Sequence, residues 1–333
     1  MKQRHHENPA IAITVGDCNG VGPEVVLKSI AHPAVRRMCR PVLVGPSSVF
    51  LYYAERLNVP LEMRRFLDIG PLPKPSSVVP LVETSPLPRS AITPGKISET
   101  AGATATAAIE KAVRLVLTGV AAGMVTAPVS KLAMAMAGVA FPGQTEMLQR
   151  LTSSPHVAMM LVSATMRVGL VTIHIPINKV SETISRALLR ERIEVVHEAL
   201  RNDWLIRKPK LAVLGLNPHA GEGGGIGTED QMVIEPVIRE LRSHRLSIEG
   251  PFPADSFFGR YEPNIYDAVI AMYHDQGLIP LKMSSFGAAV NVSAGLNIVR
   301  TSPDHGTAFD IAGKGIAKPD SMIEAIKAAA TNA

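Results

Sequence analysis

The sequence predicts an α/β protein with two α/β/α domains and a cleft between them. Short runs rich in Val, Ile, Leu and Ala repeatedly lead through Gly/Pro/Asn loops into segments of helical periodicity, as in largely parallel sheets. The chain's 333 residues exceed the usual size of one domain. Its 46% hydrophobic and 19% charged residues are a globular balance, and clefts between domains usually hold small molecules.

The expected strands are apolar runs, and they cover residues 10–15, 41–44, 122–126, 168–173, 210–216, 268–272 and 288–292. Glu99–Leu117 is expected to be a helix, because Ser98 can cap its start and Gly119 stands just past its end. Segments 181–202 and 230–244 also have helical periodicity. The Pro/Gly/Ser-rich stretch 70–94 is expected to be irregular, as is 249–263. We expect a first domain of residues 1–130 plus about 295–333, and a second of residues 131–294.

The composition argues against several classes of protein. The net charge is +5, but the basic residues are scattered and aromatic residues make up only 4%, which does not suit a nucleic-acid-binding protein. The positive excess indicates either a preference for small anions or ordinary surface lysines. No window approaches the roughly 20 apolar residues that span a bilayer, and residues 1–9 contain no apolar signal core. Two cysteines, Cys18 and Cys39, fit a reducing compartment, so we expect a cytoplasmic protein.

Three histidines follow expected strands, and the carboxyl ends of parallel strands converge on the ligand crevice. They are His174, His219 and His274. Three neutral imidazoles brought together would hold a divalent ion and leave positions open for water or substrate. A single histidine in such a place is more often a local hydrogen-bonding residue, and a purely structural zinc site is a further alternative.

Acidic and basic residues near these histidines are candidates for catalysis and anion binding. Asp255 and Asp275 could orient the histidines or take a proton from a substrate hydroxyl, although either could be a turn or capping residue. Lys282, Asn291 and Arg300 lie around one apolar strand, so we expect them to gather at one end of the cleft and bind a phosphate or carboxylate. Solvated surface charge is the alternative for the two cations.

Two glycine-rich segments could approach a ligand closely. Residues 16–24 follow the first strand and open a helix, so their N–H groups could face an anion. Residues 304–315 contain small residues that would let the backbone approach a bulky ligand, or would form a tight surface turn. Neither segment has the Gly-x-Gly-x-x-Gly spacing, and no Walker A sequence occurs, so an ordinary Rossmann dinucleotide site is not expected.

Together these segments resemble the 4-hydroxythreonine-4-phosphate dehydrogenase (PdxA) family of pyridoxal phosphate biosynthesis, itself similar to isocitrate and isopropylmalate dehydrogenases. The match runs from about residue 11 to residue 315. Its most specific pieces are residues 16–24, Thr-Ala-Pro at 126–128, Leu-Asn-Pro-His-Ala-Gly-Glu at 216–222, Tyr-His-Asp-Gln-Gly at 273–277, and 304–315.

The resemblance implies an oxidoreductase that uses NAD, or NADP in its place, and one divalent ion such as Zn, Mg, Co or Mn. It implies a homodimer with an active site shared across the interface, to which His174 of the neighbouring subunit contributes. The residue roles that it implies are metal ligands at His174, His219 and His274; substrate contacts at Gln144, Thr145, Lys282, Asn291 and Arg300; and cofactor contacts at His305, Gly306, Thr307 and Asp310. Asp255, Asp275 and Lys282 are the candidate catalytic residues.

The chain departs from the family pattern at two places. The family reads Gly-His-Thr-Glu where this chain has Gln144 after Gly143, and an amide cannot carry a proton or charge. In the first glycine loop, Cys18 and Asn19 replace Pro-Ala or a similar small pair. These changes favour a paralogue, acting on a phosphorylated sugar acid or on the terephthalate 1,2-cis-dihydrodiol. A non-catalytic anion-binding protein is the alternative from another class.

The mechanism that we expect places the substrate hydroxyl on the metal, whose charge lowers the pKa of the hydroxyl while hydride leaves for NAD. Where the resulting ketone is β to a carboxylate, the same ion would stabilise the enolate left by departing carbon dioxide. Oxidation and decarboxylation would then share one site.

Overall fold

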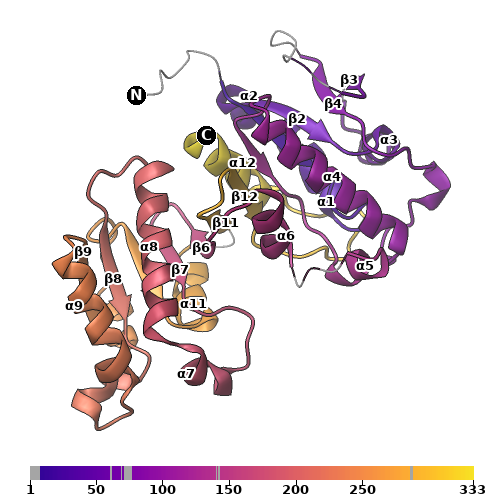
Figure 1. Ribbon diagram of the computed structural model, residues 1–333. Coiled ribbons are helices and arrows are strands. Elements are labelled where there is room, and N and C mark those ends of the chain that lie inside the picture. Colours follow the sequence, from indigo (N-terminus) through magenta and orange to yellow (C-terminus); the bar gives the residue numbers. More distant parts are fainter. Residues whose placement is uncertain are drawn as a thin grey trace. The chain divides into compact units, whose positions relative to one another are not determined.

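The computed structural model describes residues 8–60, 62–68, 70, 77–139, 141, 143–285 and 288–333. It contains two compact units, Met1–Ser154 with Leu296–Ala333, and Pro155–Gly295. Each unit has a sheet and packed helices, which confirms the predicted α/β class (Figure 1). No helix in the described ranges has the length and apolar character needed to cross a membrane.

The sheet of the first unit is parallel, with strand order β3-β4-β2-β1-β5-β12. The expected strands at 10–15, 41–44 and 122–126 are confirmed as β1, β2 and β5. The other three strands were not expected, because they are short and contain Pro or Arg. The bounds are β1 Ala10–Thr14, β2 Arg40–Val44, β3 Met63–Phe66, β4 Val79–Val82, β5 Gly123–Val125 and β12 Val299–Pro303. β4 lies inside the stretch 70–94 that was expected to be irregular, of which 71–76 fall outside the described residues.

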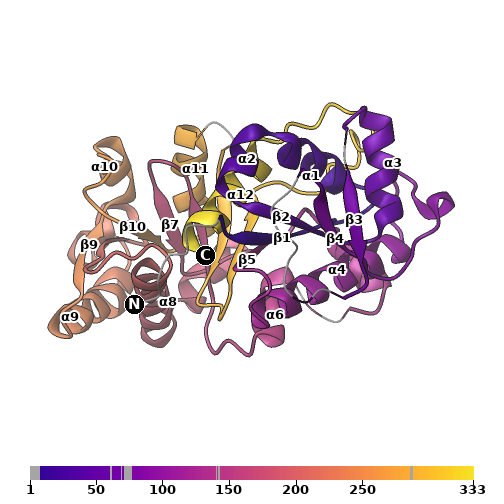
Figure 2. The same cartoon turned by 90° about the horizontal axis from the view of Figure 1, so that it is seen from above.

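Helix α4 is Glu99–Leu117, as expected, and Ser98 Oγ accepts a hydrogen bond from the N–H of Ala101 (3.2 Å). α4 packs on β1, β2 and β5, and α12 packs on β12, β5 and β1 (Figure 2). α5 also packs on α4, so closely that a Cβ at Gly102 would lie 1.9 Å from the carbonyl oxygen of Ala133. This packing places segment 131–154 in the first unit. The remaining helices are α1 Gly22–Ala31, α2 Pro33–Met38, α3 Ser47–Leu57, η1 Arg89–Ala91, α5 Lys131–Met136, α6 Gln144–Leu151 and α12 Asp320–Asn332.

The sheet of the second unit has strand order β11-β6-β7-β10-β8-β9. β7, β10, β8 and β9 are parallel, and β6 is antiparallel to β7 and β11. The strands expected at 168–173, 210–216, 268–272 and 288–292 are confirmed with shifted ends, and β6 was missed. The bounds are β6 Ala158–Val162, β7 Arg167–Leu170, β8 Lys210–Leu214, β9 Ser247–Phe252, β10 Ala268–Ala271 and β11 Val290–Ala294.

The expectation of an irregular stretch at 249–263 was wrong, because it holds most of β9 and all of α10, Ala254–Gly259. The helical segments expected at 181–202 and 230–244 each consist of two elements. Ser185 interrupts the first, where its Oγ accepts from the N–H of Leu188 (3.2 Å) and caps α8. The second begins as a π-helical turn, η4, before α9. The bounds are η2 Ile177–Lys179, α7 Val180–Thr183, α8 Arg186–Asn202, η3 Pro218–Gly224, η4 Asp230–Ile234, α9 Glu235–Ser243 and α11 His274–Ser285.

Candidate active site

The carboxyl ends of three neighbouring strands in the second unit each lead to one of the singled-out histidines. The strands β7, β10 and β8 are adjacent and parallel, with Leu170 opposite Ala271 and Ile270 opposite Val213. His174 follows β7, His274 begins α11 after β10, and His219 lies in η3 after β8. The strand-end placement expected from sequence is therefore what the fold provides.

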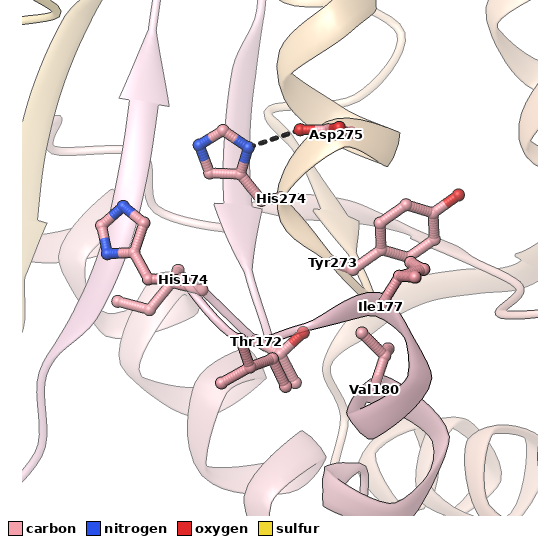
Figure 3. A pocket seen from close by; sticks show the side chains of 9 residues that line it. Thr172, His174, Ile177, Val180, Tyr273, His274 and Asp275 are labelled. Carbon is pink, nitrogen blue, oxygen red and sulfur yellow. Dashed lines mark hydrogen bonds and ion pairs between the residues drawn. The ribbon is translucent and has the colours of Figure 1, made fainter.

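Two of the three histidines lie close together. The ring centroids of His174 and His274 are 5.8 Å apart, with the ring planes inclined by 41° (Figure 3). Both rings line a cavity of about 260 Å³, together with Thr172, Tyr273 and Asp275 among others. Within the described ranges, no three His, Cys, Asp or Glu side chains form a group that could hold a metal ion, so His219 does not join this pair.

Hydrogen bonds beyond the ends of β7, β10 and β8 hold the segments that carry His174 and His274 in place. Thr172 donates to the carbonyl oxygen of Met272 from both its N–H (3.2 Å) and its Oγ1 (2.7 Å). Gln276 donates from Nε2 to the carbonyl oxygen of Gly215 (2.6 Å) and accepts from the N–H of Met272 at Oε1 (2.7 Å). Thr172 thus links the ends of β7 and β10, and Gln276 links those of β10 and β8.

The two candidate aspartates differ in their surroundings. Asp275 Oδ1 lies 2.7 Å from His274 Nδ1 (Figure 3). A carboxylate that receives the Nδ1 proton fixes the imidazole tautomer and leaves Nε2 as the free lone pair. Asp255 is exposed in the first turn of α10 and is not among the described residues that line the cavity of His174 and His274.

The loop that carries His219 adopts an unusual left-handed turn. Residues 219–223 all have positive φ, including His219 (53°), Ala220 (51°) and Glu222 (44°), a conformation that disfavours side chains with a Cβ. Asp230, only 1% exposed, supports the start of this loop by accepting from the N–H of Leu216 (2.8 Å) and of Asn217 (3.0 Å). It also accepts from Asn217 Nδ2 (2.9 Å).

Its neighbour Glu229 adds a second anchor for the same loop. Glu229 accepts from the hydroxyl of Ser181 and from Asn217 Nδ2 (2.9 Å). These hydrogen bonds, first of all the one from Ser181, hold the pKa of Glu229 near 2. The carboxylate is therefore charged throughout the physiological pH range and keeps Asn217 in place.

We expect Asp230→Asn to lower the free energy of unfolding by about 1–3 kcal/mol, since an amide cannot accept from all three N–H donors at once and leaves at least one unsatisfied. Urea denaturation of the wild type and the variant measures this loss. Asp320→Asn, at an exposed position, is the matched control and should change the free energy by less than about 0.5 kcal/mol. Equal stability of the Asp230 variant and the wild type would contradict the bracing role.

In the first unit, two residues expected to bind substrate meet directly. Arg300, 3% exposed on β12, donates from Nε to Thr126 Oγ1 (3.1 Å) and from Nη2 to Gln144 Oε1 (3.0 Å). Burial lowers the pKa of Arg300 to about 10, so the guanidinium remains charged at neutral pH. Thr145 follows Gln144 in the first turn of α6. A fixed cation beside an amide can bind an anion.

The other two expected anion-binding residues belong to the second unit. Lys282 is exposed on α11, and Asn291 lies on β11. The Oδ1 atom of Asn291 is buried and has no hydrogen-bond partner within the part of the chain that the structure describes. Its amide is therefore a polar group with unused hydrogen-bonding capacity, as expected of a ligand contact. The gathering of Lys282, Asn291 and Arg300 stays a prediction.

The loop 304–315 connects β12 to α12 and leaves several candidate cofactor residues accessible. His305, Gly306 and Asp310 are exposed, and Thr307 is half-buried. The carbonyl oxygen of Thr307 accepts from the N–H of Val21 (2.9 Å) in the first glycine loop. The two glycine-rich segments singled out from sequence therefore lie against each other.

The substitution at Asn19 acquires a structural role that the sequence did not reveal. Asn19 Nδ2 donates to the carbonyl oxygen of Lys96 (2.9 Å) and to Ser98 Oγ (3.1 Å). Asn19 Oδ1 accepts from the N–H of Thr93 (2.7 Å). The side chain thus holds segment 93–98, which leads into α4, to the first glycine loop. A fully buried amide explains why Asn stands here, and only the fold shows that it is buried.

Sequence reasoning also missed the positioning residues Thr172, Gln276, Thr126 and Asp230. A signal was present for Thr172 and Gln276, because each stands two residues from a strand-end histidine. Thr126 and Asp230 act on residues that only the tertiary fold brings near.

Comparisons with known proteins agree with the resemblance. The family model of pyridoxal phosphate biosynthetic protein PdxA matches residues 37–329. A 4-hydroxythreonine-4-phosphate dehydrogenase of Trichlorobacter lovleyi is 44% identical over 325 residues, covering 97% of each chain. A D-threonate 4-phosphate dehydrogenase of Cupriavidus necator is 41% identical and covers 96% of each chain. The crystal structure of 4-hydroxythreonine-4-phosphate dehydrogenase from Klebsiella pneumoniae matches with a TM-score of 0.89 and 34% identity, covering 99% of this chain and 100% of that one. The resemblance is thereby confirmed, and the chain belongs to the PdxA family of pyridoxal phosphate biosynthetic proteins.

Proposed function

We propose that the protein is an NAD- and divalent-metal-dependent dehydrogenase that oxidises the CH–OH group of a small phosphorylated hydroxy acid. The observation that carries the proposal is the pair of imidazoles, His174 and His274, at the ends of adjacent parallel strands with Asp275 bonded to one of them. Two relatives over 40% identical are named for 4-hydroxythreonine 4-phosphate and D-threonate 4-phosphate. Both names describe phosphorylated hydroxy compounds, and these are the substrates that we favour.

Two of the three proposed donors lie where they could face one divalent ion. Two imidazoles whose centroids are 5.8 Å apart are spaced suitably to face one ion, because metal–nitrogen bonds to zinc are about 2.0–2.1 Å. The contact of Asp275 with His274 Nδ1 leaves Nε2 for the metal. Imidazole ligands favour zinc or cobalt over magnesium. We propose His219 as the third ligand, because it follows the adjacent parallel strand β8, although it does not join the pair among the described residues of this structure. The bound ion would act as a Lewis acid that lowers the pKa of the substrate hydroxyl.

The chain's own residues would then have distinct tasks. Thr172 and Gln276 hold the strand ends so that the imidazoles keep their spacing. Asp275 maintains the tautomer of His274, and Lys282 is the candidate for proton transfer to the product enolate if decarboxylation follows oxidation. Loop 304–315 would receive NAD through its exposed residues His305, Gly306 and Asp310 and the adjacent Thr307.

Cytoplasmic location and a homodimer complete the proposal, and complementation tests which subunit's site His174 serves. A mixture of His174→Ala and His274→Ala protomers forms heterodimers that contain one intact site only if His174 acts in the site of the neighbouring subunit. Subunit exchange would then restore about a quarter of wild-type activity from two nearly inactive variants. Absence of restoration would mean that His174 and His274 of one chain hold the same ion, as their separation of 5.8 Å favours.

The anion site explains how Gln144 can replace the family histidine. Gln144 Oε1 accepts from Arg300, so its amide NH₂ group is left to donate to a bound anion. The orientation of the amide follows from this hydrogen bond. A charged guanidinium and an amide donor suit a phosphate without requiring a protonated imidazole.

We expect Gln144→Glu to raise the KM for the phosphorylated substrate more than about tenfold, because a carboxylate would pair with Arg300 and repel the anion. Gln144→His, which restores the family residue, should stay within about tenfold of the wild type. The measurement is kcat/KM with 4-hydroxythreonine 4-phosphate, D-threonate 4-phosphate and terephthalate 1,2-cis-dihydrodiol. Turnover of the dihydrodiol alone would contradict the assignment of a phosphorylated substrate.

A further inference from the structure

The loop that we propose for the dinucleotide is fastened at its start to two other segments of the first unit. The N–H of Asp304 donates to Ser321 Oγ (3.1 Å) at the beginning of α12. The carbonyl oxygen of Thr307 accepts from Val21 (2.9 Å). The residues between these anchors and the end of the loop include the exposed His305, Gly306 and Asp310.

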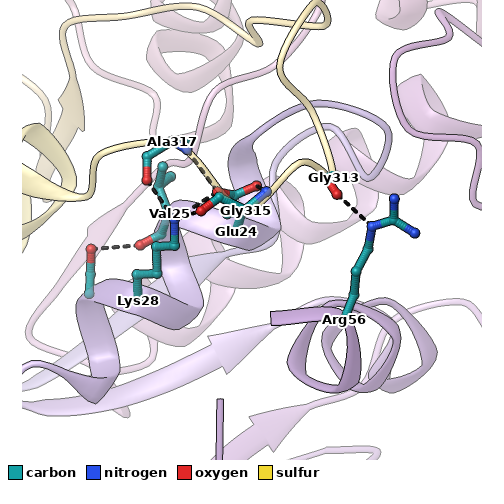
Figure 4. A network of polar contacts seen from close by, with 8 residues as sticks. Glu24, Val25, Lys28, Arg56, Gly313, Gly315 and Ala317 are labelled. Atoms are coloured by element: carbon teal, nitrogen blue, oxygen red, sulfur yellow. Dashed lines mark hydrogen bonds and ion pairs between the residues drawn. The ribbon is translucent and has the colours of Figure 1, made fainter. Parts of the chain in front are cut away.

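The end of the loop is held by an ion pair on α1 between Glu24, whose carboxylate is buried, and Lys28, whose side chain is 23% exposed. Glu24, fully buried, accepts from the N–H of Ala317 (2.8 Å), from that of Gly315 (3.3 Å) and from Lys28 Nζ (2.8 Å) (Figure 4). Lys28 Nζ also donates to the carbonyl oxygens of Gly315 (2.9 Å) and Ala317 (2.7 Å). The pair therefore bonds both the N–H and the C=O groups of the same two loop residues.

This arrangement differs from an ordinary surface salt bridge. A carboxylate without solvent contact needs several donors to offset its lost hydration, and Glu24 has three. A fully exposed pair would contribute little, whereas removing Lys28 leaves the buried carboxylate of Glu24 without its charged partner. The geometry of Gly315 and Ala317 therefore depends on both charges together.

A third anchor comes from α3. Arg56 Nε donates to the carbonyl oxygen of Gly313, as Figure 4 shows. Gly313 has φ +72°, and a Cβ there would lie 2.9 Å from Pro94 Cβ. Gly315 has φ +74°. The loop thus takes a left-handed conformation at two glycines, and a polar side chain holds each of them in place.

The first glycine loop supports this structure rather than serving as a cradle for an anion. Its glycines are needed for close contact with the protein itself. A Cβ at Gly16 would lie 2.6 Å from the carbonyl oxygen of Pro128, one at Gly20 2.9 Å from that of Thr307, and one at Gly22 2.8 Å from that of Val15. Residues 16–27 are all buried. The expectation that the N–H groups of this segment face an anion is therefore not supported by the packing.

We propose that Glu24 and Lys28 are positioning residues that hold the end of loop 304–317 in the conformation that receives the dinucleotide, a role that rests on the proposed function. The pair touches the backbone of the loop, and its contacts all lie within the first unit. Without the ion pair, a smaller fraction of molecules would have the loop in the conformation that binds the dinucleotide. The apparent affinity for the dinucleotide should fall by the same factor. The histidine pair in the second unit should be unaffected.

Lys28→Met removes the ammonium and retains the length of an apolar side chain, so it tests the pair directly. We expect the KM for NAD to rise about 10–100-fold, with the KM for the hydroxy acid and the metal content unchanged. Amide hydrogen exchange of a peptide covering residues 313–318 should become faster in this variant. Glu24→Gln, which is nearly isosteric, serves as the second variant and should shift both measurements in the same direction.

Lys327→Met is the matched control, because Lys327 pairs with Glu324 (2.6 Å) on α12 of the same unit and makes no contact with loop 304–317 in the hydrogen bonds of the described residues. It should leave the KM for NAD and the exchange of 313–318 at wild-type values. Unchanged amide hydrogen exchange of residues 313–318 in both Lys28→Met and Glu24→Gln would contradict the proposal that this ion pair, the clamp, holds the end of the loop. Faster exchange with an unchanged KM for NAD would overturn its link to the dinucleotide. A wild-type protein that neither binds nor reduces NAD would overturn the proposed function, while the exchange data would still report on the clamp.

Discussion

Replacing His274 with alanine is expected to lower turnover more than about 100-fold, while the thermal midpoint stays within a few degrees of the wild type. Loss of a residue that supports a metal ligand typically costs 10–100-fold in affinity or activity, and loss of the ligand itself should cost more. His274 begins α11 and its side chain is 38% exposed, so its removal leaves no large cavity. Steady-state kinetics and metal analysis of the purified variant measure both effects.

Asp275→Asn provides the graded control for this experiment. The amide can still accept from His274 Nδ1 but lacks the negative charge that strengthens this hydrogen bond, so we expect a loss of about 10–100-fold. The Asp275 side chain is 71% exposed, so its replacement should not disturb folding. A loss of activity in Asp275→Asn would therefore reflect the site itself. Full activity of His274→Ala at saturating NAD and substrate would remove the metal role from the histidine pair.

Arg300→Lys is expected to lower kcat/KM for the anionic substrate about 100-fold. A lysine keeps the charge but loses the planar fork with which Arg300 bonds Thr126 and Gln144 at once. Each hydrogen bond to a charged group contributes about 1.5–3 kcal/mol, so the loss of one or two accounts for the expected factor. Most of the loss should appear in the KM of the anionic substrate.

Arg114→Lys, at an exposed position on α4 of the same unit, is the matched control and should behave as the wild type. Competitive inhibition by inorganic phosphate gives an independent measurement of the anion site. The inhibition constant should rise in Arg300→Lys by a factor similar to that of the KM. An unchanged KM for the substrate in Arg300→Lys would show that Arg300 braces the fold without binding the anion.

The elements that could be predicted are those whose cause is local. Ser98 and Gly119 mark the ends of α4, and the apolar runs of β1, β8 and β10 are buried strands. The strand-end placement of the three histidines follows from parallel topology alone. The link of Gln144 with Arg300 could be inferred only from the resemblance, because the two residues are far apart in the sequence.

The features that could not be predicted depend on tertiary contacts. β9 contains Gly250 and Pro251, which are typical of loops, and it pairs with β8 through a register shift between Ala212 and Leu214. β12 carries Arg300, whose burial is stabilised by Thr126 and Gln144 from other segments. Burial of this kind is not visible in the local sequence.

The roles of the buried carboxylates also could not be predicted from the sequence. Asp230 and Glu24 look like ordinary surface acids in the sequence, and only the fold shows that their partners are backbone N–H groups of loops. The left-handed turn at His219 is likewise set by Asp230 and Asn217, whose contacts no pattern of single residues reveals.

NADH formation by the purified, metal-loaded protein tests directly whether it is a metal-dependent dehydrogenase. The protein should reduce NAD with 4-hydroxythreonine 4-phosphate or D-threonate 4-phosphate, a metal chelator should abolish the reaction, and a divalent ion added back should restore it. Absence of NADH with both phosphorylated substrates, or turnover that a chelator does not affect, would contradict the proposed metal-dependent dehydrogenase.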